Sequence, residues 1–308
     1  MYVRVSGLLL FASFWSVRTG AEHWCYQSQV TCETPCKGPD DWHELYEDCK
    51  EKEQSPINIV TGKTVLDDKL TPFIFKGYQE AFTGILKNNG HTVKVSVPFS
   101  ATVSGGDLRD TYKAVQFHLH WGQNGGPGSE HTIDGEQYPM ELHIVHMKER
   151  FKTLEDALKE RHGVAVLGFF YEESKSENKK YNKLIQALEE VQNANENTTV
   201  SGISLNNLIL SEENMTRYYR YDGSLTTPGC TEGVVWTVFE HPIPLSKEQL
   251  KAFSNLKFHD GKDMVKTFRP VQPRYDRIVY RSDSTVVMLS FTLLLVCLCS
   301  VLGFSQRY

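Results

Sequence analysis

Two short segments, QFHLHWG and MELHIVH, constrain the fold of this chain more than any other feature. In a β-strand, side chains two positions apart project from the same face, so His118 and His120 can share one ion. His143 supplies a third imidazole if its own segment, Met140 to Met147, pairs beside the first strand. Three neutral imidazoles with a fourth position left for water are typical of catalytic zinc, since structural zinc is usually closed by four protein ligands. The pattern therefore predicts neighbouring strands that hold a catalytic metal ion.

The alternative for each histidine is an ordinary core residue that hydrogen-bonds inside the protein. The clustering of imidazoles with the carboxylates Glu130 and Glu141 argues against this alternative. Five of the chain's 11 histidines lie between positions 118 and 146, namely His118, His120, His131, His143 and His146. Such clustering is costly unless something binds it, which favours a metal site.

Two polar residues are placed to support the proposed ligands. Gln116 and Glu141 each lie two positions before a histidine, on the same strand face. Metal-binding histidines usually donate their second ring N–H to such a partner, which fixes the orientation of the ring. The alternative is a polar side chain on a half-buried strand that touches only water, and the matched offsets favour the supporting role.

The two ends of the chain differ from the segment between them. Residues 1–20, with Arg4 followed by an apolar stretch and small residues, have the pattern of a secretory signal peptide. Residues 283–308 contain an apolar run from Val286 to Phe304. This run either spans a bilayer as a helix or is removed when a glycolipid anchor is attached near Ser282. Both alternatives place the intervening domain outside the cell.

Residues 21–282 have a length compatible with one domain. Without Arg4, Arg18, Asp283 and Arg307, 30 basic and 37 acidic residues remain, so the domain carries a formal charge of −7. This acidic balance argues against nucleic acid as a partner.

Short strands dominate the expected secondary structure. An apolar stripe at helical spacing from Tyr181 to Val191 predicts a helix, and Ser246 with Gln249 forms a capping box before another. We therefore expect a single mainly β (α+β) domain with peripheral helices. The expected strands are His91 to Val97, Ala114 to Trp121, Met140 to Met147, Val164 to Tyr171 and Gly233 to Phe239.

The cysteines and two sequons agree with passage through the secretory pathway. The domain contains five cysteines, an odd number, so at most two disulfides form and their connectivity stays open: Cys25, Cys32, Cys36, Cys49 and Cys230. Asn197 and Asn214 begin N-glycosylation sequons, each a short match.

Several segments resemble those of the α-class carbonic anhydrases. In chain order these are QSPINI (54–59), NNGH (88–91), QFHLHWG (116–122), GSEHTIDG (128–135), MELHIVH, GSLTTPGC (223–230) and FRPVQP (268–273). The resemblance covers essentially the whole domain. Within the family the chain is most similar to the membrane-anchored, glycolipid-linked isozyme IV, through HWCY near its start, a cysteine-rich N-terminal segment and the apolar tail.

The resemblance implies a central, mostly antiparallel twisted sheet of about ten strands with a conical cavity. One Zn²⁺ would lie at its base on His118, His120 and His143. The enzyme would interconvert carbon dioxide and bicarbonate by attack of zinc-bound hydroxide.

It also implies roles for particular side chains. Thr226 would orient the hydroxide through Glu130, and Thr226 with Thr227 would hold the substrate. His91 would be the proton shuttle, with an ordinary pKa of about 6.5, and we expect the charge of Lys94 to lower that pKa. The apolar wall for carbon dioxide would consist of Val145, Val166, Leu225 and Trp236, although Val145 and Val166 are equally compatible with ordinary core packing.

Further implications concern covalent structure and partners. The backbone carbonyl of Thr267 would orient His120. The disulfides would be Cys25 with Cys36 and Cys49 with Cys230, and Cys32 would either be free or replace Cys36 as the partner of Cys25. The resemblance further implies a monomer on the outer face of the plasma membrane, near bicarbonate transporters.

A different class of function is a non-catalytic binding or adhesion module of the same fold. Members of that kind typically lose a zinc-binding histidine. This chain retains all three, together with Thr226 and Glu130, so the sequence favours the enzyme.

Overall fold

A computed structural model describes residues 23–31, 36–98 and 100–283. The predicted signal peptide (1–20) and nearly all of the C-terminal apolar segment (283–308) lie outside the described residues. Within them the chain forms a large twisted sheet of 12 strands and a small sheet of three. Its strands are β1 (Asn58–Ile59), β2 (Val65–Leu66), β3 (Phe73–Lys76), β4 (Phe82–Asn88), β5 (Val93–Ser96), β6 (Thr102–Gly105), β7 (Leu108–Trp121), β8 (Thr132–Ile133), β9 (Glu136–Gln137), β10 (Met140–Lys148), β11 (Val164–Ser174), β12 (Asn197–Ile203), β13 (Tyr218–Ser224), β14 (Glu232–Ser246) and β15 (Tyr280–Arg281).

The large sheet is mostly antiparallel. Its main path runs β12-β4-β5-β7-β10-β11-β14-β13-β15-β2, and β3 and β6 pair beside β7. Within the described part of this large sheet, only the pairs β11 with β14 and β15 with β2 are parallel. The predicted fold class is therefore confirmed, and the sheet has 12 strands where about ten were expected.

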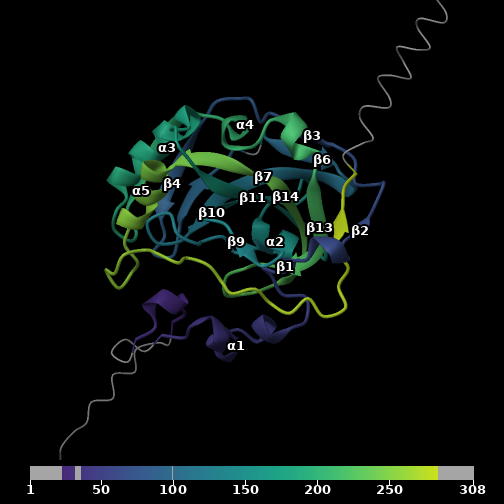
Figure 1. The fold of residues 1–308 in the computed structure, drawn as a ribbon, viewed down its shortest axis with the longest axis horizontal. Helices are drawn as coiled ribbons and strands as arrows, with labels where there is room; N and C mark the ends of the chain where they lie inside the picture. Colours follow the sequence, from purple (N-terminus) through teal and green to yellow (C-terminus); the bar gives the residue numbers. More distant parts are fainter. Residues whose placement is uncertain (1–22, 32–35, 99, 284–308) are drawn as a thin grey trace, which may run out of the picture.

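Short helices lie around the sheet. Figure 1 shows α3, α4 and α5 along one side of it and α1 with the N-terminal segment on the opposite side. The capping box at Ser246 is formed and begins α5. The stripe from Tyr181 to Val191 is helical but divides into a 3₁₀ turn, α3 and a second 3₁₀ turn. The helices are α1 (Trp42–Leu45), α2 (Leu154–Leu158), α3 (Asn182–Ala187), α4 (Leu205–Leu208) and α5 (Lys247–Ala252).

Buried apolar side chains form two clusters on opposite faces of the central strands. Ile144 belongs to the larger cluster and Val145 to the smaller one. Neighbouring residues separate in this way because successive side chains of a strand point to opposite faces. The face of the smaller cluster also carries His143 and Glu141, so it is the face on which the predicted site is built.

Two disulfides join described cysteines, one within the N-terminal segment and one between segments 181 positions apart. Cys25 pairs with Cys36 and Cys49 with Cys230, so both implied pairings are confirmed. Cys32 lies outside the described residues. Among the part of the chain that the structure describes, no helix combines the length and apolar character needed to cross a bilayer.

Candidate metal centre

Three histidines from two adjacent strands converge on one point. Strands β7 and β10 pair with His118 directly opposite His143, and His120 lies one same-face position along β7. One ring nitrogen from each residue lies within 4.8 Å of the others. The ring centroids are 4.7 to 5.2 Å apart. The site therefore follows from strand alternation and from the register of one strand pair.

The other nitrogen of each ring is held by an oxygen. Thr267 O lies 2.6 Å from His120 Nδ1, and Glu141 Oε1 lies 2.7 Å from His143 Nε2. Gln116 Oε1 lies 3.0 Å from His118 Nδ1. Because carbonyl and carboxylate oxygens only accept hydrogen bonds, the hydrogens reside on these outer nitrogens. Each inner nitrogen is then left with a lone pair directed at the common centre.

The chemistry of this donor set fits a divalent metal ion. His120 Nε2 and Glu130 Oε2 are buried and make no hydrogen bond within the described residues. Burial lowers the pKa of His118, His120 and His143, so all three imidazoles are neutral at physiological pH. Neutral imidazoles are the form that binds zinc. The cluster can therefore hold a metal ion.

Glu141 organises the buried side of the centre. Its Oε2 accepts the backbone N–H groups of Glu130 and His131, and its Oε1 accepts from both His131 and His143. Burial raises the pKa of Glu141, but the neighbouring His131 and His143 outweigh that effect and hold it well below the usual range. An ionised carboxylate thus fixes the orientation of His143.

A hydrogen-bonded chain extends from this carboxylate into the protein. His131 Nε2 lies 2.6 Å from the Tyr221 hydroxyl, which lies 2.8 Å from Ser55 Oγ. All three side chains are buried. The chain reaches from the metal centre to the QSPINI segment, which explains how residues near position 55 contribute to the site.

Glu130 lies beside the inner nitrogens. Its Oε2 is 3.3 Å from His120 Nε2, and its Oε1 accepts from the backbone N–H of Arg269 at 2.8 Å. Burial raises the pKa of Glu130 well above its ordinary value, while Arg269 and the Thr226 side chain oppose part of that rise. The structure thus brings Thr226 and Glu130 together next to the three histidines.

The four predicted wall residues lie in one apolar patch. Val145, Val166 and Trp236 belong to the smaller core cluster, and the partly buried Leu225 packs against it. The strand register places Val145 opposite Val166 and Val166 opposite Trp236. The Trp236 ring is also 4.8 Å from that of His143, centroid to centroid. Thr227, also predicted here, follows Thr226 and is partly buried.

His91 differs from its expected state. Its ring stacks on Trp24 with centroids 3.7 Å apart and planes 13° apart, and its buried Nδ1 has no hydrogen-bond partner among the described residues. Its pKa is lowered to about 4, chiefly by burial and then by His259 and His23. The expectation of an ordinary pKa is therefore wrong for this conformation. Lys94 pairs with His118, and it is not among the principal causes of the lowered pKa of His91.

Sequence reasoning gave no role to three residues of the site. His131 was counted in the cluster without its part in the Glu141 chain. Arg269 lies in the quoted FRPVQP segment, and its buried guanidinium donates to Gln54 and to the backbone carbonyls of Ser55 and Cys49. Trp24 lies in HWCY, yet no spacing rule connects it to His91. The FRPVQP segment could have indicated Arg269, and HWCY could have indicated Trp24.

The comparisons with known proteins agree with this geometry. Residues 37–283 match the family model of the eukaryotic-type carbonic anhydrases, so the chain belongs to that family. It is accordingly an enzyme, a carbonate dehydratase, and its substrates are carbon dioxide and bicarbonate.

Among individual proteins the chain is similar to carbonic anhydrase 4. It is 40% identical to the protein of that name from Rattus norvegicus over 292 residues, which cover 92% of this chain and 93% of the relative. The Oryctolagus cuniculus protein is 41% identical over 274 residues, 88% of each chain. Carbonic anhydrase 12 of Homo sapiens is 37% identical over 259 residues, 81% of this chain and 72% of that protein.

Proposed function

We propose that this carbonic anhydrase is an extracellular, membrane-tethered zinc enzyme whose zinc ligands are His118, His120 and His143. The observation that carries the proposal is the orientation of the three rings, each held through its outer nitrogen so that its inner nitrogen faces one centre. Zinc held by three neutral imidazoles would lower the pKa of a bound water to about 7 and so supply hydroxide at neutral pH.

Thr226 and Glu130 would align the attacking hydroxide. A hydroxyl group donates one hydrogen bond and accepts others, so Thr226 can donate to Glu130 and accept a hydrogen from the nucleophile. This polarity requires an ionised Glu130; burial opposes that form, whereas the backbone N–H of Arg269 and a bound zinc ion would favour it. A lone pair of the nucleophile then faces the substrate.

The apolar patch would receive carbon dioxide. Val145, Val166, Leu225 and Trp236 offer no hydrogen bonds that compete for a nonpolar substrate, apart from the Trp236 indole N–H, which donates to Ser224 O at 2.9 Å. Because that donor is engaged, the patch presents only apolar surface beside His143. Thr226 and Thr227 would hold an oxygen of carbon dioxide or bicarbonate at the polar edge.

His91 would carry the proton from the centre to buffer. In the stacked conformation its pKa of about 4 makes it a poor acceptor near neutral pH. We therefore assign the transfer to a conformation in which the ring has left Trp24 and regained water, where an ordinary imidazole suits transfer in both directions.

The sequence supports an anchored location outside the cell. Both sequon residues, Asn197 and Asn214, are exposed, and Ser282 directly follows β15, the last strand of the sheet in chain order. A glycolipid anchor near Ser282 is the proposed tether, and a spanning helix is the alternative. Release of the protein from cells by phosphatidylinositol-specific phospholipase C would support the glycolipid, and retention would support the helix.

The catalytic proposal is tested by stopped-flow carbon dioxide hydration. The purified full-length protein is measured as isolated, after zinc removal with dipicolinate, and after zinc is restored. We expect activity to disappear and return. Activity that survives complete loss of zinc, verified by elemental analysis, would overturn the assignment of the metal.

A further inference from the structure

A second cavity lies on the other face of the sheet from the metal centre. Strands β13 and β14 place Tyr221 opposite Trp236 and Arg220 opposite Thr237. Tyr221 and Trp236 contact His131 and therefore face the metal centre. Since strand residues alternate between faces, Arg220 and Thr237 point away from it.

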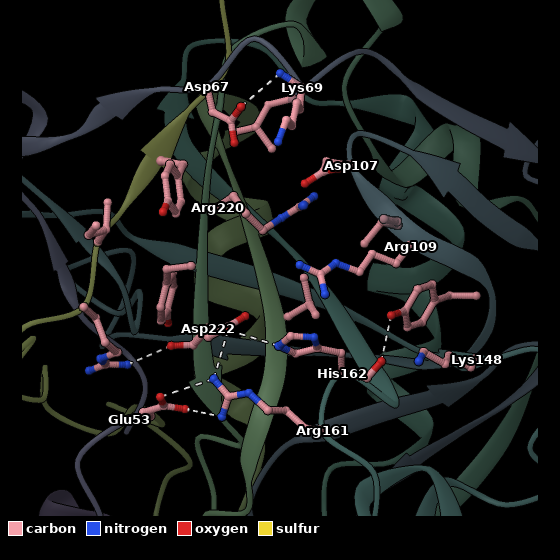
Figure 2. A pocket seen from close by; sticks show the side chains of 18 residues that line it. Glu53, Asp67, Lys69, Asp107, Arg109, Lys148, Arg161, His162, Arg220 and Asp222 are labelled. Atoms are coloured by element: carbon pink, nitrogen blue, oxygen red, sulfur yellow. Dashed lines mark hydrogen bonds and ion pairs between the residues drawn. The ribbon is translucent and has the colours of Figure 1, made fainter.

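This cavity, which we call the Arg220 cavity, has a volume of about 690 Å³ and a charged lining (Figure 2). Its charged and polar lining includes Lys69, Asp107, Arg109, Tyr112, Arg220 and Asp222. They come from β7, β13 and the turns before β3 and β7, so the cavity is formed by distant parts of the chain.

Arg220 is a buried cation without a counter-ion. Its side chain is only 8% exposed, and it lies against the rings of Phe73 and Tyr218. Nε and Nη2 both donate to Thr237 Oγ1, and Nη1 makes no hydrogen bond within the described residues. None of the ion pairs in the described part of the chain includes Arg220. A buried charge in this state is costly unless an anion joins it.

Three further cations line the same space without an ion pair among the described residues, namely Lys69, Arg109 and Arg277, of which Arg277 donates to backbone carbonyls. Arg109 and Lys69 line the cavity and are likewise absent from the ion pairs between described residues. Figure 2 shows the Arg109 and Arg220 guanidinium groups extending into the middle of the view, between Asp107 and His162.

The carboxylates of the cavity leave these cations largely uncompensated. Asp222 is paired with Arg161 and His162, and Glu53 is paired with Arg161. Asp67 accepts the backbone N–H of Lys69 at 3.0 Å. Asp67 and Asp107 are therefore the lining carboxylates without an ion pair among the described residues, and Asp107, exposed on the turn between β6 and β7, is among the charges that act on Arg220.

We propose that the Arg220 cavity binds a small tetrahedral oxyanion, a phosphate or sulfate group, between Arg220, Arg109 and Lys69. Guanidinium forks match such oxygens with paired hydrogen bonds. A tetrahedral anion also fits better than a planar carboxylate, because the three donors approach from three separate segments.

Inorganic phosphate is the first probe, titrated calorimetrically into the full-length zinc-loaded protein at constant ionic strength. Arg109→Ala tests the site without disturbing the core, because Arg109 is exposed. Arg220→Lys keeps the charge but loses the fork. We expect each variant to bind phosphate about tenfold more weakly, the usual effect of one charge-assisted contact. Asp107→Asn should strengthen binding about threefold by removing the competing charge.

Lys87→Ala is the matched control, because Lys87 is an exposed cation on β4, several strands away from the cavity. Glycerol 3-phosphate forms a second arm, and tighter binding than inorganic phosphate would show that the group is carried on an organic molecule. Absence of binding in both arms, or equal weakening by Arg109→Ala and Lys87→Ala, would overturn the proposal. Thermal unfolding checks that the Arg220→Lys variant is folded. If that variant is not folded, Arg109→Ala alone decides whether the cavity binds the anion. The readout is anion binding, so it is independent of the proposed hydration chemistry.

Discussion

Replacing Trp24 with alanine is expected to raise the pKa of His91. The indole covers one face of the imidazole, with ring centroids 3.7 Å apart. Burial is the largest of the effects that lower the pKa of His91 from 6.5 to about 4. At about 1.4 kcal/mol per pH unit, this difference corresponds to about 3 kcal/mol against the protonated ring. Removing the indole readmits water to that face, so the pKa should rise by about one pH unit or more.

The assay is a proton NMR titration of the His91 ring in the unaltered protein and in Trp24→Ala. His259→Ala should raise the pKa by less, because His259 is a secondary cause. Lys94→Ala is the control and should leave the value unchanged. A pKa near 6.5 in the unaltered protein, or no change on removal of Trp24, would refute the reasoning.

The same shift sets a pH dependence of stability. A histidine whose pKa is lower in the folded protein than in the unfolded chain is protonated first in the unfolded chain as pH falls. Relative to His91→Gln, the free energy of unfolding should therefore decline from pH 6.5 toward pH 4, by at most about 3 kcal/mol. Denaturant titrations at several pH values measure this difference, and parallel curves for the two proteins would contradict it.

Three further outcomes follow from the metal centre and the long disulfide. Zinc removal should lower the thermal midpoint as well as the activity, because neutral imidazoles remain buried around the vacated centre, and an unchanged midpoint would argue against this. Glu141→Gln should weaken zinc affinity about 10 to 100-fold, since His131 and His143 lose their charged acceptor. Competition with a chelator measures the zinc affinity. Equal affinity in the two proteins would count against a role of Glu141 in orienting His143. Replacing Cys49 and Cys230 by serine should cost about 5 kcal/mol in urea unfolding, because the bridge spans 181 positions. A loss of unfolding free energy below about 1 kcal/mol would show that this disulfide does not restrict the unfolded chain to the expected extent.

The strands that carry the metal centre could be predicted because their signal is local. Alternation in QFHLHWG and MELHIVH places His118, His120 and His143 on one strand face, and β7 and β10 contain these segments. Strands β12 and β13 were not predicted. Strand β12 is polar and largely exposed, and it is held by pairing with β4, more than 100 positions away. Such a strand is defined by its partner rather than by its own pattern.

The parts of the site that escaped prediction are those with no local spacing. His131 reaches Tyr221 across 90 positions, and the Arg269 guanidinium reaches Gln54 across 215. The lowered pKa of His91 depends on Trp24, which a disulfide-bonded N-terminal segment brings to it. A pKa is set by everything that packs around a group, so the identity of His91 alone indicated only an ordinary value.

The strand pair β13 and β14 serves two sites with adjacent residues. Tyr221 and Trp236 pack toward the metal centre, whereas Arg220 lines the cavity and donates hydrogen bonds to Thr237. A shift of one residue in β13 would exchange Arg220 for Tyr221 on each face, and the same shift in β14 would exchange Thr237 for Trp236. The bulge between Gly223 and Ser224 ends the regular pairing just before Thr226. The register of this strand pair must therefore be set by the residues before the bulge. The disulfide between Cys49 and Cys230 holds the segment that follows the bulge. We infer that the alternation in this one strand pair couples the integrity of the metal centre to that of the cavity, and Tyr221, which hydrogen-bonds to His131 and also lines the cavity, belongs to both.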